Sequence, residues 1–265
     1  MGVDVHECSQ NEQAPPPAAS PAPPLPRHPA RSAVRAIVAT GIAFFLTGTP
    51  AGAVGAPVPS GSPRPPAAVP TARSETLAAF NQGSRALAAG DWGEAEKSLR
   101  RAVEDDPRLV EAWNNLGIAL LRQEKIDGAR AAFDRAISLD PTYPFALQNA
   151  GLLRLEEDGK PAEAAELFRR AAVADPDAAA PRVNLAIALA RAGRFVEAQA
   201  VLSAARRRFP RDPDVLYHLG TLSERAGDRA RAAEAYAAFL AAARGTRTDR
   251  ERAVRERLVA WGKVR

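Results

Sequence analysis

The feature that most constrains this chain is a period of about 34 residues that begins near residue 76. Small residues recur at intervals of 34, 34, 35 and 34 positions, at Gly83, Gly117, Gly151, Ala186 and Gly220. The same period relates Ala95, Ala129, Ala164, Ala198 and Ala232, and relates Pro107, Pro141, Pro176 and Pro210. The one extra residue falls within "EEDGKP" between Gly151 and Ala164, where a turn tolerates an insertion. A period of this length predicts a stack of similar supersecondary units.

Each unit contains two segments with the apolar spacing of an amphipathic helix. In the second unit these residues are Trp113, Leu116, Leu120 and Leu121, then Ala129, Ala132, Phe133, Ala136 and Ile137. The small residues Gly117 and Ala129 are expected to face each other across a closely packed helix pair. Asp-Pro pairs at 106–107, 140–141 and 175–176 predict the steps between units, because the residue before proline is driven out of helical geometry.

The second unit resembles the tetratricopeptide repeat family in Trp113, Leu116, Gly117, Leu120, Ala129, Phe133, Ala136 and Pro141. Leu120 replaces an aromatic residue of the family pattern. The first and fifth units depart further, at Gln82 and at Arg244. The resemblance implies an all-α fold, a right-handed α-solenoid of five helix-turn-helix units in a domain at 74–246, preceded by a disordered N-terminal region. The expected units are 76–109, 110–143, 144–178, 179–212 and 213–246, with a C-terminal capping helix at 247–265.

The first 53 residues have the pattern of an export signal. Arg27, Arg31 and Arg35 precede the uncharged run "AIVATGIAFFL" at 36–46, and small residues follow at 51–53. We expect cleavage after Ala53. Two alternatives remain: an uncleaved membrane anchor over 36–56, or a segment without a targeting role. Export or anchoring would place the rest of the chain outside the cytoplasm, in a bacterial periplasm, cell envelope or medium. Six prolines predict a semi-rigid linker at 54–73.

The residue inventory argues against catalysis. The chain has one cysteine, Cys8, and three histidines, His6, His28 and His218, of which only His218 lies beyond the predicted cleavage point. Cys–His catalysis and metal sites rich in histidine are therefore not expected. The sequence also has no glycine-rich phosphate loop. We expect no enzymatic activity, no catalytic or metal-binding residue and no cofactor.

The resemblance implies that the first helix of each unit lines a concave groove that binds a protein or an extended peptide. One position of these helices carries Asn81, Asn115, Asn149, Asn184 and His218. Carboxamides could bind a peptide backbone, or they could serve a structural role between repeats. Apolar candidates on the same face are Phe80, Ile118, Phe145, Leu152, Val183, Ile187 and Tyr217. No Lys or Arg occupies the positions at which some family members bind a terminal carboxylate, so that mode is not expected.

The net charge of +5 is concentrated at the C-terminus. Residues 244–265 hold eight Arg or Lys and three Asp or Glu, and a second basic cluster lies at 206–208. The favoured function is an extracytoplasmic protein-binding scaffold or adaptor. The alternative is a binder of an anionic surface or polymer through the basic C-terminal helix. Nucleic acid is not expected as a partner, and the membrane is expected only through an uncleaved N-terminal segment. The partner's identity and the oligomeric state are left open.

Overall fold

The computed structural model describes residues 72–243, 245 and 247–263, and all regular structure within them is helical. The predicted signal peptide, anchor and disordered N-terminal region lie outside these residues, as does the linker up to residue 71. The all-α prediction is confirmed. The helices are α2 (Ala72–Ala89), α3 (Trp92–Asp105), α4 (Val110–Arg122), α5 (Ile126–Leu139), α6 (Pro144–Glu156), α7 (Pro161–Ala174), α8 (Ala180–Arg191), α9 (Phe195–Arg208), α10 (Pro213–Arg225), α11 (Arg229–Ala243) and α12 (Thr248–Ala260).

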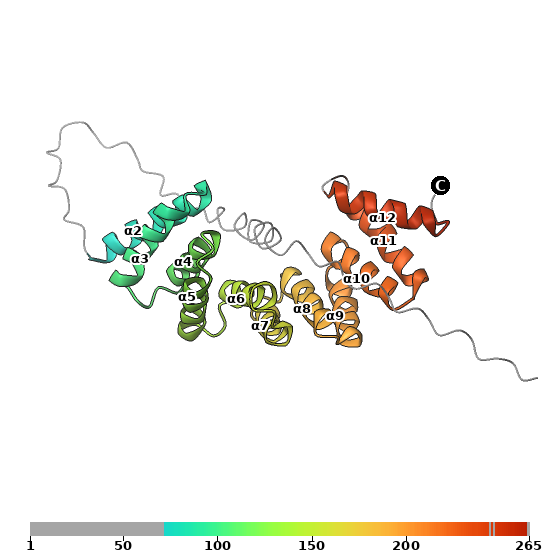
Figure 1. Cartoon of the computed structure of the whole chain (residues 1–265), viewed down its shortest axis with the longest axis horizontal. Helices are drawn as coiled ribbons and strands as arrows, with labels where there is room; N and C mark the ends of the chain where they lie inside the picture. The colour runs from blue at the N-terminus through green and yellow to red at the C-terminus, as the bar shows by residue number, and fades with distance from the viewer. Residues whose placement is uncertain (1–71, 244, 246, 264–265) are drawn as a thin grey trace, which may run out of the picture.

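The helices form a curved solenoid of five pairs followed by α12 (Figure 1). The first helices α2, α4, α6, α8 and α10 contact one another in succession, and each packs on the second helix of its own pair. The labels of α4, α6 and α8 lie toward the inner side of the arc, and those of α5 and α7 lie toward the outer side (Figure 1). In the described part of the chain, no helix is both long and apolar enough to cross a membrane.

Proline fixes the steps between units, as the Asp-Pro pairs predict. Asp106 and Asp140 follow α3 and α5 in extended geometry, with φ of −132° and −133°, and Asp175 follows α7 with φ of −122°. The side chain of Asp106 accepts a hydrogen bond from Arg108 N, and that of Asp140 accepts one from Thr142 N. These bonds explain why aspartate precedes the proline, since it closes the turn locally.

The turn inside each unit requires a left-handed residue. Gly90, Gly159, Gly193 and Gly227 have φ between 62° and 79°. In the second unit this position is held by Glu124, the one non-glycine residue of the described chain with positive φ, at 63°. A side chain costs about 1–2 kcal/mol in this conformation, so the second turn is strained relative to the others.

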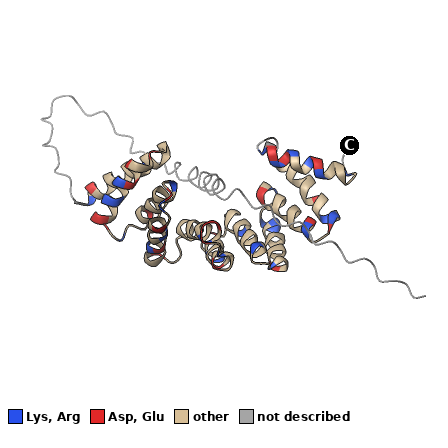
Figure 2. Cartoon of the chain, in the orientation of Figure 1, with Lys and Arg blue, Asp and Glu red and all other residues tan. Residues whose placement is uncertain are grey.

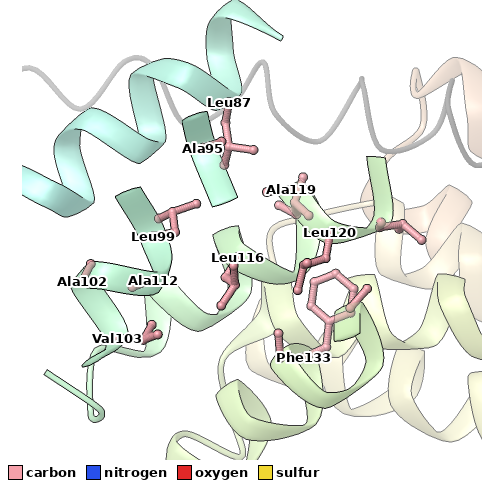
Figure 3. Packing of buried hydrophobic residues seen from close by; sticks show 14 of the residues in the cluster. Leu87, Ala95, Leu99, Ala102, Val103, Ala112, Leu116, Ala119, Leu120 and Phe133 are labelled. Atoms are coloured by element: carbon pink, nitrogen blue, oxygen red, sulfur yellow. The ribbon is translucent and has the colours of Figure 1, made fainter. Parts of the chain in front are cut away.

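The core is built on glycines that face large side chains. A Cβ on Gly117 would lie 2.5 Å from Phe133, one on Gly151 would lie 2.7 Å from Phe168, and one on Gly220 would lie 2.5 Å from Tyr236. The nearest side chain to Gly117 is therefore Phe133 and not Ala129, which corrects the expectation from the sequence. The fully buried Phe133 points toward α4, near Leu120 (Figure 3). The phenyl ring occupies the space that a glycine leaves on the facing helix.

Ion pairs and ring contacts tie neighbouring units together. The Asp158 carboxylate forms ion pairs with Arg130 at 2.6 Å and with Arg154 at 3.0 Å, and the Arg130 guanidinium lowers the pKa of the Asp158 carboxyl. The Arg122 guanidinium lies 5.1 Å from the Trp92 ring centre, and that of Arg225 lies 4.4 Å from the ring centre of Phe195. Both cation–π contacts cross a unit boundary and hold successive pairs in register.

Candidate partner-binding groove

A row of polar side chains crosses the first-helix layer at one repeated position. Asn81 on α2 is exposed, and its four counterparts on α4, α6, α8 and α10 are half-buried: Asn115, Asn149, Asn184 and His218. Each member lies on the first helix of its own unit. The periodicity predicts this shared position. It does not predict which members are engaged within the chain.

Two of the predicted asparagines belong to a hydrogen-bond network between repeats. Asn149 Nδ2 donates to Asn114 Oδ1 at 2.9 Å, and Asn114 Nδ2 donates to Asn115 Oδ1 at 3.2 Å. Asn115 Nδ2 in turn donates to Ser84 Oγ at 3.3 Å, so the network joins α6, α4 and α2. Asn114, at 1% exposed, is the buried centre. A buried carboxamide needs such partners, which gives Asn115 and Asn149 a structural role.

Asn81 and Asn184 do not belong to this hydrogen-bond network. Within the described residues, the side chains of Asn81 and Asn184 form no hydrogen bond. Each carboxamide therefore keeps a donor and an acceptor for a ligand. His218 contacts the Tyr217 ring edge-on, with centroids 5.2 Å apart.

Three of the apolar candidates lie in the core, which corrects their assignment to the groove. Ile118, Leu152 and Val183 are 7%, 7% and 5% exposed and belong to the buried clusters. They are covered because each packs into a buried hydrophobic cluster built from several neighbouring helices. Side chains in this position have no surface left for a partner.

The other four apolar candidates keep accessible surface. Phe80, Phe145, Ile187 and Tyr217 are half-buried. Phe145 packs edge-on against Tyr143 with ring centroids 5.5 Å apart. Sequence reasoning missed Leu77, which is 47% exposed on α2. Leu77 lies 68 positions before Phe145, two repeat lengths, so the same periodicity could have identified it.

Apolar and carboxamide side chains pair on three of these helices. Leu77 and Asn81 are four residues apart on α2, as are Phe145 and Asn149 on α6. Asn184 and Ile187 are three apart on α8. Residues at these spacings lie on one helix face. Each pair thus offers an apolar contact beside a carboxamide, although Asn149 already donates to Asn114.

The C-terminal end of the row is covered by α12. The centres of the Tyr217 and Phe239 rings lie 5.4 Å apart, and the Arg250 guanidinium lies 4.9 Å from the centre of the Tyr217 ring. Beside it, Tyr236 donates to Glu224 Oε2 at 2.7 Å, and burial raises the pKa of Tyr236. Part of the Tyr217 surface is therefore taken up by contacts with α11 and α12.

Most of the basic charge of α12 is matched by carboxylates. Arg247 and Arg250 each approach Asp214 to 2.7 Å, and Arg257 approaches Glu224 to 3.4 Å. Arg252 pairs with Asp249 inside the helix at 2.6 Å. Figure 2 shows both signs of charge on α12. This pairing weakens the case for an anionic-surface binder.

The described residues offer no arrangement typical of a metal centre. No group of three or more His, Cys, Asp or Glu side chains in this part of the chain could hold a metal ion. Many of its carboxylates instead form ion pairs, as Glu96 does with Lys125 at 2.7 Å and Glu156 does with Arg191 at 2.9 Å. Such pairs stabilise the repeat stack and leave the carboxylates engaged.

Comparison with known proteins gives a consistent family. Sequence profiles described as tetratricopeptide repeat match residues 80–144, 155–219 and 214–244. The lipoprotein NlpI homolog of Haemophilus influenzae is 36% identical over 73 residues, which cover 28% of this chain and 23% of the relative. Protein FlbA of Caulobacter vibrioides is 31% identical over 140 residues, covering 53% of this chain and 23% of FlbA. The chain thus spans less than a quarter of either relative.

Solved structures share the fold at lower identity. The type IV pilus biogenesis factor PilW has a TM-score of 0.59 and 22% identity, over 66% of this chain and 80% of PilW. YrrB, described as a TPR protein with an unusual peptide-binding site, has a TM-score of 0.54 and 17% identity, over 65% of this chain and 89% of YrrB. Identities this low support the fold alone.

Proposed function

The chain belongs to the tetratricopeptide repeat family, and from that premise we propose that it is a non-catalytic scaffold that binds an extended segment of a partner protein outside the cytoplasm. The segment would lie across the first-helix layer and contact α2, α6 and α8. Solenoids of this kind present long concave surfaces because each repeat contacts only its neighbours.

The observation that carries this proposal is the unengaged carboxamide of Asn184 beside the half-buried Ile187. A carboxamide can accept from a backbone N–H and donate to a backbone carbonyl, so it suits an extended chain regardless of sequence. The neighbouring apolar side chain would take a side chain of the partner. Asn81 with Leu77 repeats this pairing at the other end of the row, which favours a ligand that spans several repeats.

One relative supports an envelope location for the proposed scaffold, because it is called a lipoprotein. The apolar run at 36–46 behind three arginines supports export. If the signal is cleaved as proposed, N-terminal sequencing of protein from cells will find Val54 first. An unprocessed, soluble cytoplasmic protein would exclude both export and anchoring.

A site-specific crosslinking experiment tests the binding surface. A photo-reactive residue at position 184 should capture a partner in intact cells. The matched control is position 196, because Val196 on the second helix α9 is 83% exposed and equally able to meet solvent-borne proteins. Capture of the same partner at both positions with equal yield would contradict the groove.

Ionic strength separates the proposed function from its rival. An apolar and carboxamide groove should retain its partner as salt rises, because neither contact depends on net charge. Binding of an anionic surface through α12 should weaken steeply. Release of the partner, bound without crosslinking, on raising the salt, together with weaker binding on neutralising Arg252 and Arg255, would favour the rival.

A further inference from the structure

Helix α12 occupies the place that the first helix of a sixth repeat would take. It begins at Thr248, 35 residues after Pro213 begins α10, and it packs on α11 (Figure 1). Ion pairs of Arg250 with Asp214 and of Arg257 with Glu224 join α12 to α10, and Arg247, the residue before α12, also pairs with Asp214. The last helix of the described chain is therefore held to α10 partly by ion pairs.

The contact between α12 and the fifth repeat has an apolar centre and an ionic rim. Val254 and Leu258 are fully buried in one cluster with Leu216, Phe239 and Ala243. The rim consists of Arg247 and Arg250 on Asp214 and of Arg257 on Glu224, with Arg250 also over Tyr217. We call the covered surface of α10 and α11 the helix seat; its residues are Asp214, Leu216, Tyr217, Glu224, Tyr236, Phe239 and Ala243.

A short hinge connects the seat to the helix that fills it. Only four residues separate Ala243 from Thr248, and Gly245 among them has φ of 84°. The buried Glu251 carboxylate holds this bend, accepting from Gly245 N at 2.9 Å and from Arg247 N at 3.3 Å. The bend at Gly245 and its hydrogen bond to Glu251 thus add to the apolar and ionic contacts that hold α12 in place. A short bent hinge of this kind favours exchange between chains.

We propose that α12 is exchangeable and that the helix seat also binds α12 of a second copy of this chain, which gives a reciprocal dimer. The chemistry of the seat is complementary to this helix: two carboxylates at the rim and an aromatic centre meet three arginines and two aliphatic side chains. Exchange would remake the apolar and ionic contacts between α12 and the helix seat, so the two forms would differ in the hinge, and the dimer would gain population as the protein concentration rises. This inference is independent of the groove.

A charge-reversal pair of full-length variants tests the exchange. Asp214→Arg places a cation opposite Arg247 and Arg250, and the double variant Arg247→Asp, Arg250→Asp places anions opposite Asp214. In each variant, like charges at position 214 and at positions 247 and 250 repel each other, which weakens the contact of α12 with the helix seat of the same chain. When the two are mixed, each α12 meets a seat of opposite charge in the other chain. We expect a heterodimer of twice the monomer mass by size exclusion with light scattering.

The matched control carries all three substitutions in one chain, which restores attraction within the chain and should give a folded, closed monomer. A mixture that stays at monomer mass while this control folds would overturn the proposal. A mixture that stays monomeric but binds an added peptide of residues 247–263 would also overturn it, because the seat would then serve a free helix. A Gly245→Ala chain, strained in the bent hinge, should show a larger dimer fraction than wild type at equal concentration.

Discussion

Gly117 on α4 and Phe133 on α5 fit together so closely that a Cβ on the glycine would lie 2.5 Å from Cε1 of the ring. The same relationship joins Gly151 to Phe168 and Gly220 to Tyr236. In the fourth unit the corresponding residues are Ala186 and Leu202, both buried in one cluster. In the fourth unit, alanine on the first helix thus accompanies leucine on the second, whereas in the first unit Gly83 faces Leu99.

We expect Gly117→Ala to lower the free energy of unfolding by about 1–3 kcal/mol, because the new methyl group overpacks a buried aromatic contact. The control is Gly93→Ala on α3, where the nearest atom to a Cβ is 3.8 Å away. There the better helix propensity of alanine should raise stability by about 0.5–1 kcal/mol. Urea unfolding of both variants checks the signs. Equal effects at the two positions would contradict the close packing.

The natural Ala186–Leu202 pair suggests a rescue. Adding Phe133→Leu to Gly117→Ala should recover part of the stability, since the smaller side chain makes room for the methyl group. A double-mutant cycle measures this coupling, which should be favourable and between about 0.5 and 3 kcal/mol for residues in contact. Strict additivity of the two substitutions would show that they do not share the same space.

Glu124→Gly should stabilise the protein by about 1 kcal/mol, because it relieves the left-handed strain at the turn between α4 and α5. The reciprocal change, Gly193→Ala at the equivalent turn between α8 and α9, should lower stability because it introduces that strain. Thermal unfolding of the two variants provides the measurement. A lower melting temperature for Glu124→Gly would mean that contacts of the Glu124 side chain outweigh its backbone strain.

Glu96 should make the contact between the first two units sensitive to acid. Burial raises its pKa, but hydrogen bonds from Lys125, Arg100 and Gln123 prevail and lower the pKa to about 2, from an ordinary value of 4.5. Because the folded-state pKa is the lower one, this stabilisation is complete above pH 4.5 and is lost as the pH falls toward 2.

The check on Glu96 is a comparison of wild type with Glu96→Gln. The stability advantage of wild type should be present at about pH 6 and smaller at about pH 3. The midpoints of urea unfolding of both proteins, measured at each pH, give this stability difference. A difference that does not change with pH would mean that the carboxylate is not stabilised by its partners in the folded protein.

The asparagine row should divide into two groups. Asn149→Ala removes a donor from the buried Asn114, and should lower the free energy of unfolding by about 1–3 kcal/mol. Asn184→Ala should leave stability nearly unchanged and weaken partner binding by the worth of one or two hydrogen bonds, about 0.5–1.5 kcal/mol each. Melting curves beside a pulldown with the crosslinked partner separate these outcomes. A destabilised Asn184→Ala that binds normally when folded would assign Asn184 to the scaffold.

The sequence alone determined the repeat architecture and the positions that recur. The interval of 34 residues at Gly83, Gly117 and Gly151 is a property of the chain, and so are the Asp-Pro steps. A helix pair cannot bury its own apolar face, so a periodic chain of this kind must stack. The row from Asn81 to His218 follows from the same register, because equal spacing places residues on one side of every first helix.

Only the tertiary structure decided what each member of the row does. Periodicity treats Asn115, Asn149 and Asn184 alike, yet the first two are linked through Asn114 while Asn184 forms no hydrogen bond among the described residues. The periodicity also places Ile118 and Ile187 at equivalent positions, yet in the structure Ile118 is buried and Ile187 is only half-buried. The reason is physical: burial and hydrogen bonding depend on which side chain the neighbouring repeat supplies. The spacing along the chain does not specify which side chains lie next to each other in the folded protein.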